Sequence, residues 1–192
     1  DLIQCAAQVF VEEIALHTGR SLRTSSIPMG GTANVVITQE QDFRRLCPGQ
    51  VARLERLPAP GAEGFRLFAE LVDGKQLDLY AIGSDPRGTF YAMGQLLRLL
   101  ELSEGKIHAD MLLNGISSTP QCAMRGHQLG YRDKQNTLPC WTEKEFDRYI
   151  RELALFGTNS IELLPPRTDD HLFSREMQVD PFILMAHVAQ IV

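Results

Sequence analysis

Hydrophobic and polar positions alternate most regularly in two stretches near the middle of the chain, residues 65–71 and 77–81. An apolar residue at every second position is typical of a β-strand with one face turned to a core. Asp73-Gly74 lies between the two stretches, and this pair is typical of a tight hairpin turn that needs positive φ. The pattern predicts an antiparallel hairpin.

Apolar residues recur at spacings of three and four in residues 2–18 and 87–102, which predicts two amphipathic helices. A short β-branched run at residues 33–38 predicts a buried strand. We expect a short helix and a loop within residues 40–61 and one further strand at residues 108–113. Strands and helices in this order, with a hairpin among them, favour an α+β domain in which helices pack on one sheet.

The polar, turn-rich residues 114–120 are the expected domain boundary. We place an α+β accessory domain, without catalytic function, at residues 1–118 and a second region at residues 119–192. The second region shows a different order of elements: strand, helix, strand and helix, expected at residues 122–131, 142–156, 159–164 and 180–192.

The first helix of the second region has a capping box, because Glu145 follows Thr142 at the spacing that satisfies free backbone donors. Strand–helix–strand–helix with short links predicts two parallel strands joined by a right-handed crossover. Parallel strands need both faces of their sheet covered, and two helices cannot cover both. The pattern therefore predicts the first two βα units of an incomplete barrel.

Composition excludes several classes of function. The chain has 192 residues, of which 44% are apolar and 22% charged, as in ordinary globular domains. Its net charge of -5 argues against a nucleic-acid partner, which would need clustered Lys and Arg. No apolar run reaches the ~18 residues of a membrane span. The sequence also lacks a glycine-rich phosphate loop, so we expect no nucleotide cofactor.

The cysteines offer no metal-ligand spacing, so we expect no metal site. They are widely separated, and we interpret them as small core residues, although two disulfides are arithmetically possible: Cys5, Cys47, Cys122 and Cys140. The cysteines leave the cellular compartment open, and a secreted or periplasmic location is slightly favoured over a cytoplasmic one.

Three segments resemble known families when taken together. Residues 85–97, which follow the hairpin, resemble the end of the small α/β domain that precedes the barrel in the hexosaminidase and α-glucuronidase families. Met124-Arg125-Gly126-His127 resembles the Arg-Gly opening of the first barrel strand in the hexosaminidases. Residues 141–166, in which Phe156-Gly157-Thr158-Asn159 leads into a strand, look like the first helix and second strand of such a barrel.

The resemblance implies a fold and a function. The fold would be a hexosaminidase/α-glucuronidase-like accessory domain followed by the start of a TIM barrel. The parent protein would be a glycoside hydrolase acting on a complex carbohydrate, with the subfamily left open between the two families. In these families the catalytic acids lie on later strands, which here would come after Val192. We therefore nominate no catalytic residue and expect the chain itself to be inactive.

In a (β/α)₈ barrel the chemistry gathers at the carboxyl ends of the strands. A sugar site needs hydrogen-bonding side chains and an aromatic surface. On the barrel interpretation, the candidate substrate-binding residues are Arg125, His127, Tyr131, Arg132, Glu162 and Arg167. Glu162 interrupts an apolar strand, so its burial would require a partner such as Arg125 or Arg132.

Two other hypotheses stay open. The chain can be a stand-alone carbohydrate- or protein-binding module whose last strands pair with another chain, which predicts self-association through the incomplete barrel. It can also be an unrelated α/β enzyme that acts through the polar residues between Glu162 and His171. This last hypothesis predicts turnover of chromogenic glycosides or esters by the 192-residue chain alone.

Overall fold

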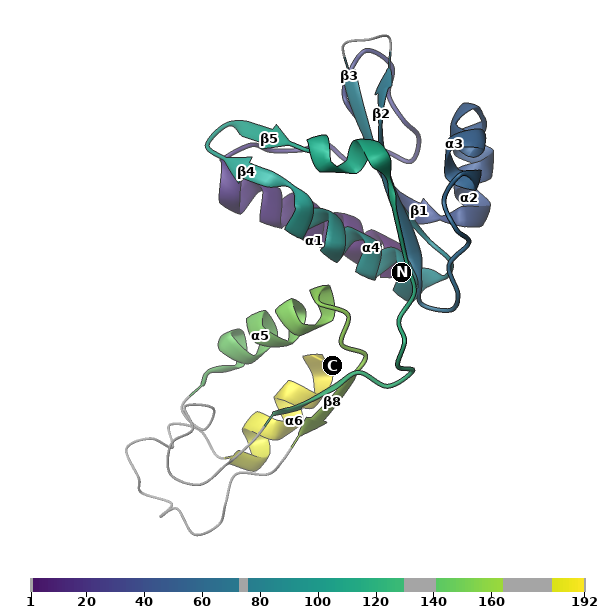
Figure 1. Ribbon diagram of the computed structural model, residues 1–192. Coiled ribbons are helices and arrows are strands. Elements are labelled where there is room, and N and C mark those ends of the chain that lie inside the picture. The colour runs from purple at the N-terminus through teal and green to yellow at the C-terminus, as the bar shows by residue number, and fades with distance from the viewer. Residues whose placement is uncertain (1, 73–75, 130–140, 164–180, 192) are drawn as a thin grey trace. The chain divides into compact units, whose positions relative to one another are not determined.

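A computed structural model describes residues 2–72, 76–129, 141–163 and 181–191. The chain divides into two compact units, Asp1–Gln121 and Cys122–Val192. Figure 1 shows both units, and each is described here by itself.

The first unit is built on a four-stranded mixed sheet with the strand order β1-β3-β2-β6. Its strands are β1 (Val35–Gln39), β2 (Phe65–Val72), β3 (Gln76–Gly83) and β6 (Ile116–Ser118). β2 and β3 pair antiparallel along their full length, which confirms the predicted hairpin. The predicted turn at Asp73-Gly74 lies outside the described residues. β1 pairs parallel with β3, and β6 pairs antiparallel with β2.

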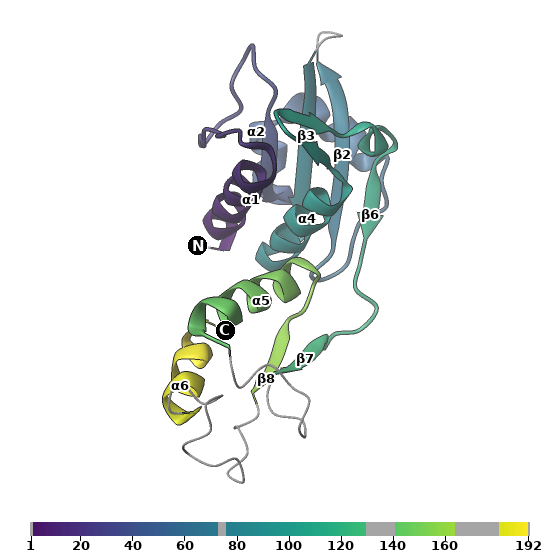
Figure 2. The same ribbon diagram turned by 90° about the vertical axis from the view of Figure 1, so that its left-hand side faces the viewer.

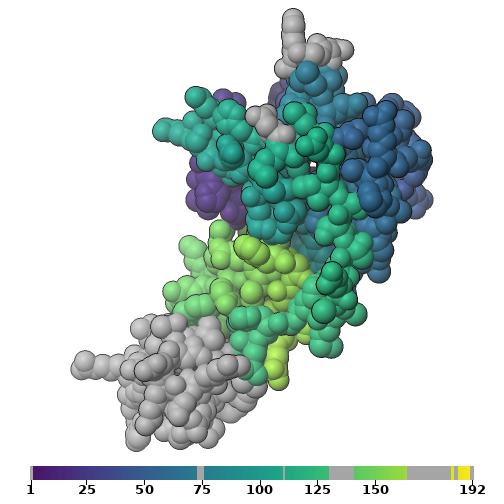
Figure 3. Space-filling model, in the orientation of Figure 1, coloured from purple at the N-terminus to yellow at the C-terminus, as the bar shows by residue number. Residues whose placement is uncertain are grey.

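Helices cover both faces of this sheet (Figures 1 and 2). On one face lie the two predicted long helices, α1 (Leu2–Thr18) and α4 (Pro86–Leu99). On the other face lie α2 (Glu40–Leu46) and α3 (Val51–Glu55), joined by the 3-10 turn η1 (Pro48–Gln50). Figure 3 shows the residues of α2 and α3 along one side of this unit. The segment 40–61 thus holds two short helices where we predicted one.

The core beneath α2 and α3 is aromatic. Phe43 of α2 meets the rings of Phe68 and Tyr80 edge-on, with centroids 6.0 Å and 5.6 Å away. The rings of Phe68 and Tyr80 stack at 4.7 Å, since the two residues are register partners on β2 and β3. Such ring pairs each contribute about 0.5–1.5 kcal/mol beyond the burial of their area.

A close approach of backbones joins the end of β3 to the start of α4. Asp85 caps α4 by accepting a hydrogen bond of 2.8 Å from the backbone nitrogen of Gly88. A methyl group on Gly83 would lie 2.1 Å from the backbone nitrogen of Thr89, and one on Gly88 would lie 2.3 Å from the carbonyl oxygen of Gly64. Only glycine fits at either position.

The expected strand at residues 108–113 is wrong. The chain instead forms a small hairpin, β4 (Glu101–Ser103) and β5 (Lys106–His108), around Gly105 at φ 68°, and then the 3-10 helix η2 (Asp110–Asn114). Leu112 is fully buried whereas Met111 and Leu113 are exposed. The buried residues Ala109 and Leu112 are three positions apart, which is the period of a 3-10 turn and not of a strand.

The polar residues 114–120 do more than separate two domains. Within them, Ile116, Ser117 and Ser118 pair with β2 as an edge strand of the first sheet. Ser117 Oγ also donates to the carbonyl oxygen of Pro58 at 2.7 Å. The division of the chain falls after this strand, between Gln121 and Cys122.

The second unit has the element order that the sequence predicts. β7 (Gly126–Leu129) is followed by α5 (Glu143–Leu155), β8 (Ser160–Leu163) and α6 (Pro181–Ile191). β7 and β8 pair parallel, with Gly126 opposite Ser160 and Leu129 opposite Leu163. Together with the first unit, this makes the protein an α+β chain with both mixed and parallel sheets.

Candidate functional site

The second unit places helices on one face of its parallel strand pair. Leu129 of β7 is buried in a cluster with Phe146 and Ile150 of α5 and Val188 of α6. Ile161 and Leu163 of β8 pack against the same cluster, together with Trp141, Tyr149 and Leu153. Since alternate residues of a strand face opposite sides, this face consists of His127 and Leu129 on β7 and Ile161 and Leu163 on β8.

The start of α5 is held by the predicted capping box. Glu145 Oε2 accepts hydrogen bonds from the backbone nitrogen of Thr142 at 2.7 Å and from its hydroxyl at 2.9 Å. These hydrogen bonds, with the backbone contact the larger, hold the pKa of the Glu145 carboxyl below its ordinary value. The capping box fixes where α5 begins.

The opposite face of β7 and β8 carries polar side chains. Gln128 and Glu162 are register partners, and the Nε2 of Gln128 donates to the Oε2 of Glu162 at 2.9 Å. From the sequence we expected a partner such as Arg125 or Arg132 if Glu162 were buried. Glu162 is exposed and is bonded by Gln128, and Arg132 lies outside the described residues. Because α5 and α6, the described helices of this unit, pack on the other face, we call the face formed by Gly126, Gln128, Ser160 and Glu162 the helix-free face.

Arg125 lies at the amino end of β7. Its Nε donates to the carbonyl oxygen of Gly157 and its Nη1 to that of Cys122, both at 2.7 Å. The backbone nitrogen of Arg125 donates to Oδ1 of Asn159 at 2.9 Å. These contacts tie the entrance of β7 to the turn between α5 and β8. Because these guanidinium hydrogen bonds go to backbone carbonyl oxygens, the geometry favours a structural role for Arg125.

His127 belongs to the helix-covered face. Its Nε2 forms a hydrogen bond of 3.1 Å with the hydroxyl of Tyr149 on α5, and the two rings meet edge-on at 5.7 Å. Trp141 packs against the other side of this group, 5.1 Å from the ring of Tyr149. The structure therefore does not bring His127 together with Glu162, because the two side chains lie on opposite faces of the strand pair.

The remaining candidate residues, Tyr131, Arg132 and Arg167, lie outside the described residues. Gln128 was not among the candidates named from the sequence, although the alternation of residues along its strand indicates which face it occupies. Leu129 is apolar and Gln128 precedes it directly, so the period of two sets Gln128 on the face opposite to Leu129. The same alternation places the side chain of Glu162 on the face opposite to Ile161 and Leu163.

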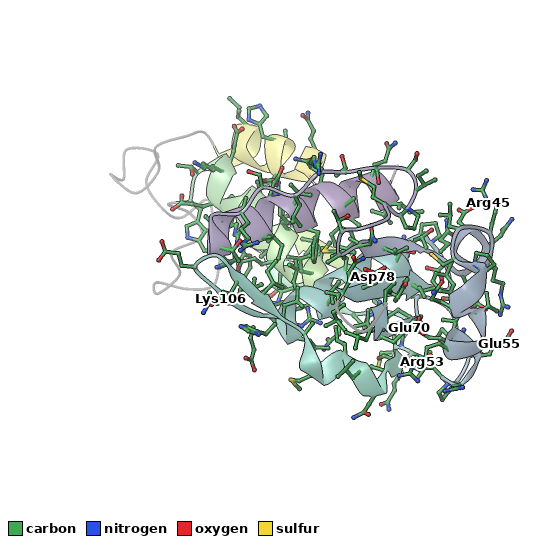
Figure 4. The ribbon with its side chains drawn as sticks, turned by 90° about the horizontal axis from the view of Figure 1, so that it is seen from above. Arg45, Arg53, Glu55, Glu70, Asp78 and Lys106 are labelled. Carbon is green, nitrogen blue, oxygen red and sulfur yellow. The ribbon has the colours of Figure 1, made fainter. Side chains whose placement is uncertain are left out.

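A second group of ionisable residues occurs on the sheet of the first unit (Figure 4). Glu70 and Asp78 are register partners on β2 and β3. Asp78 is buried and accepts hydrogen bonds from the backbone nitrogen of Asn34 at 2.9 Å and from Nε2 of Gln76 at 3.0 Å. One carboxylate oxygen of Glu70, Oε2, is buried and has no hydrogen-bond partner among the described residues. Asp78 thus anchors the start of β1 to β3.

Burial and the nearby carboxylates raise the pKa values of two neighbouring side chains, Tyr80 and Cys47. Burial, followed by the charge of Asp78, raises the pKa of the Tyr80 hydroxyl far above its ordinary value. Burial and Asp78 likewise raise the pKa of the Cys47 thiol. Cys47 is buried as predicted, but Cys5 and Cys122 are exposed, and Cys140 lies outside the described residues. The Tyr80 hydroxyl and the Cys47 thiol therefore stay protonated, and both residues belong to the hydrophobic core.

Among the residues that the structure describes, no group of three or more His, Cys, Asp or Glu side chains is placed to hold a metal ion. None of the described helices is both long enough and apolar enough to cross a membrane.

No protein-family model matches the sequence, and no curated protein sequence matches it. The structure is similar to that of an inactive mutant of a family 20 exo-β-N-acetylglucosaminidase from Vibrio harveyi, with 16% identity and a TM-score of 0.54 over 85% of this chain. It is also similar to that of CpGH84B, with 16% identity and a TM-score of 0.51 over 88% of this chain.

The matched part covers 20% of the first of these proteins and 26% of the second. The chain therefore spans about a fifth to a quarter of the glycoside hydrolases whose structures it resembles. At this level of identity the likeness shows a shared fold.

Proposed function

We propose that this chain is the opening part of a glycoside hydrolase that acts on a complex carbohydrate. The first unit is its accessory domain, and the second is the first two βα units of a (β/α)₈ barrel. The observation that carries the proposal is the parallel pair of β7 and β8, with apolar residues packed on α5 and α6 on one face and polar residues on the other.

The helix-covered face has the apolar packing that a barrel requires between its strands and helices. In such a barrel the helices form an outer ring, and the alternate residues of each strand point into the interior. Leu129, Ile161 and Leu163 are the outer residues on this assignment, and Gln128 and Glu162 are inner ones. The fold shared with parts of two glycoside hydrolases supports the same assignment.

The candidate residues divide by position. Glu162, with Gln128, is the substrate-binding candidate on the helix-free face. Tyr131 and Arg132 follow β7 in the sequence and Arg167 follows β8, so all three come after the carboxyl ends of their strands, where barrel enzymes bind substrate. Arg125 and His127 support the strands from the amino end and the helix side.

The test compares two proteins, the 192-residue chain and the complete polypeptide that its gene encodes. Both are assayed with chromogenic 4-nitrophenyl glycosides, including the N-acetyl-β-D-glucosaminide and the α-D-glucuronide. We expect the complete polypeptide to hydrolyse at least one of them and the 192-residue chain to hydrolyse none.

Two results would overturn the proposal. A complete polypeptide that melts cooperatively yet leaves every glycoside intact contradicts glycosidase function. Turnover by the 192-residue chain alone contradicts the barrel assignment and favours an independent enzyme. Self-association through the incomplete barrel and a secreted or periplasmic location stay predictions alongside the proposal.

A further inference from the structure

Asn114 and Gly115 connect two anchored segments of the first unit. Arg53 of α3 donates to the carbonyl oxygen of Leu113 at 2.5 Å, which fixes the end of η2. Directly after Gly115, Ile116 begins β6 and pairs with β2 (Figure 2). The link between these two anchors therefore consists of Asn114 and Gly115 alone.

The backbone at residue 115 requires glycine. Its φ of 76° lies in the left-handed region, which residues with a side chain rarely adopt. A methyl group built on Gly115 would also lie 2.9 Å from Cδ2 of Leu57, closer than real contacts of this kind. An asparagine thus stands directly before a residue without a side chain, and no bulk keeps the Gly115 nitrogen from the side chain of Asn114.

The side-chain amide of Asn114 is free to turn. Asn114 is exposed, and its amide has no hydrogen-bond partner among the described residues. The other asparagines that the structure describes are held. The amide oxygen of Asn34 accepts from the backbone nitrogen of Met29 at 2.8 Å. The amide oxygen of Asn159 accepts from the backbone nitrogen of Arg125 at 2.9 Å, and both amide nitrogens donate to carbonyl oxygens.

One hydrogen bond opposes a reaction between Asn114 and Gly115. The backbone nitrogen of Gly115 donates to the carbonyl oxygen of Leu112 at 3.1 Å, and a nitrogen held in this way does not attack. This bond closes the last turn of a 3-10 helix of five residues, where hydrogen-bond geometry is poor and helix ends fray. The bond therefore slows the reaction and does not prevent it.

We propose that Asn114 is a site of spontaneous covalent modification, at which asparagine becomes aspartate and isoaspartate. The Gly115 nitrogen bonds to Cγ of Asn114, and its proton passes through water to the amide nitrogen, which leaves as ammonia. Water then opens the resulting succinimide at either ring carbonyl. Breaking the nitrogen–Cγ bond gives aspartate, and breaking the bond from nitrogen to the main-chain carbonyl gives isoaspartate. This inference does not depend on the proposed glycosidase function.

The two products differ in what they do to the fold. Isoaspartate adds a methylene group to the main chain directly before β6. Since Arg53 holds one side of the link and the pairing of Ile116 holds the other, the added length displaces β6 from β2. Aspartate leaves the main chain as it was and adds a charge at an exposed position. Isoaspartate alone is therefore the product that destabilises the first unit.

The test incubates the 192-residue chain at mildly alkaline pH and follows each asparagine by peptide mass spectrometry, with isoaspartate labelled by protein isoaspartate methyltransferase. We expect Asn114 to gain the mass difference between an amide and a carboxyl group while Asn34 and Asn159 stay unchanged. The same chain unfolded in guanidinium shows that the incubation time suffices for the chemistry. Asn114→Gln is the matched variant, because it keeps the amide but its longer side chain disfavours ring closure, and it should not convert.

Urea denaturation followed by circular dichroism measures the effect on stability. We expect a lower midpoint for the incubated unsubstituted protein, and unchanged midpoints for incubated Asn114→Gln and for fresh Asn114→Asp. A native protein that keeps Asn114 while the unfolded chain converts it overturns the proposal, because the Gly115 hydrogen bond then protects the site. Equal conversion of Asn34 or Asn159 overturns the role given to the free amide. A lower midpoint in fresh Asn114→Asp overturns the role given to isoaspartate.

Discussion

Because the backbone of α4 approaches Gly83 closely, replacing this glycine with alanine should lower the stability of the first unit by an amount that the contact distances set. In Gly83→Ala the new methyl group would lie 2.1 Å from the backbone nitrogen of Thr89, 2.4 Å from its hydroxyl and 2.6 Å from the carbonyl carbon of Gly88. Since real contacts of this kind are essentially never under 3.0 Å, the start of α4 must move away from β3 by about 0.9 Å. Two of the three nearest atoms belong to the backbone, so no side-chain rotation relieves the clash.

The movement has two unfavourable consequences for the free energy of unfolding. Overpacking a core lowers it by about 1–3 kcal/mol. Thr89 is fully buried and donates to the carbonyl oxygens of Asp85 at 3.0 Å and Thr38 at 3.3 Å, so its displacement removes a buried hydrogen bond at about 1–3 kcal/mol. Alanine also lowers the conformational entropy of the unfolded chain, which offsets about 0.4–1 kcal/mol of this loss. We expect a net loss of roughly 1–6 kcal/mol from these ranges.

Gly49→Ala is the control, because nothing lies within 4 Å of its added methyl group. Urea denaturation followed by far-UV circular dichroism measures both variants, and fluorescence of the single tryptophan, Trp141, follows the second unit separately. We expect a lower midpoint for Gly83→Ala in circular dichroism and little change in Trp141 fluorescence. Equal midpoints for the two variants would refute the reasoning.

Three shorter predictions concern thiols, pH and Arg125. Cys47 is buried with a raised thiol pKa, so a thiol reagent followed by peptide mass spectrometry should modify it at least about tenfold more slowly than exposed Cys5; equal rates contradict its burial. The pKa of Glu145 is lowered in the folded state, so its contribution is present above its ordinary value of 4.5 and is lost as pH falls through the folded value. The urea midpoint by Trp141 fluorescence should therefore fall on acidification, and by a smaller amount in Glu145→Gln; an equal fall in both proteins opposes this role. Lysine cannot reach both carbonyl oxygens that Arg125 binds, so Arg125→Lys should lower the stability measured by Trp141 fluorescence by about 1–3 kcal/mol. An unchanged midpoint would show that this contact is dispensable.

Local patterns predicted the elements that depend on neighbours along the chain. The hairpin of β2 and β3, the long helices α1 and α4, and the capping box at Thr142 all follow from periods of two or 3.6 and from short-range hydrogen bonds. Such signals involve residues close in sequence, so they do not depend on the rest of the fold.

Elements held by distant partners were predicted poorly. Residues 116–118 look like part of a polar linker, yet they form β6 because β2 offers them a free edge. Residues 110–114 have the apolar composition of a strand but form η2, in which Leu112 is fully buried. A sequence pattern does not show which strand edge of a sheet is unpaired or which side chain becomes buried.

The candidate site shows the same division. The sequence alone determined that β7 and β8 frame a crossover helix, because strand, helix and strand follow one another at the required lengths. It also determined that neighbouring residues such as His127 and Gln128 face opposite ways. Only the tertiary structure decided that Gln128 meets Glu162, that His127 meets Tyr149, and that Arg125 donates to the carbonyl oxygen of Gly157. These contacts join residues more than twenty positions apart, and packing alone brings them together.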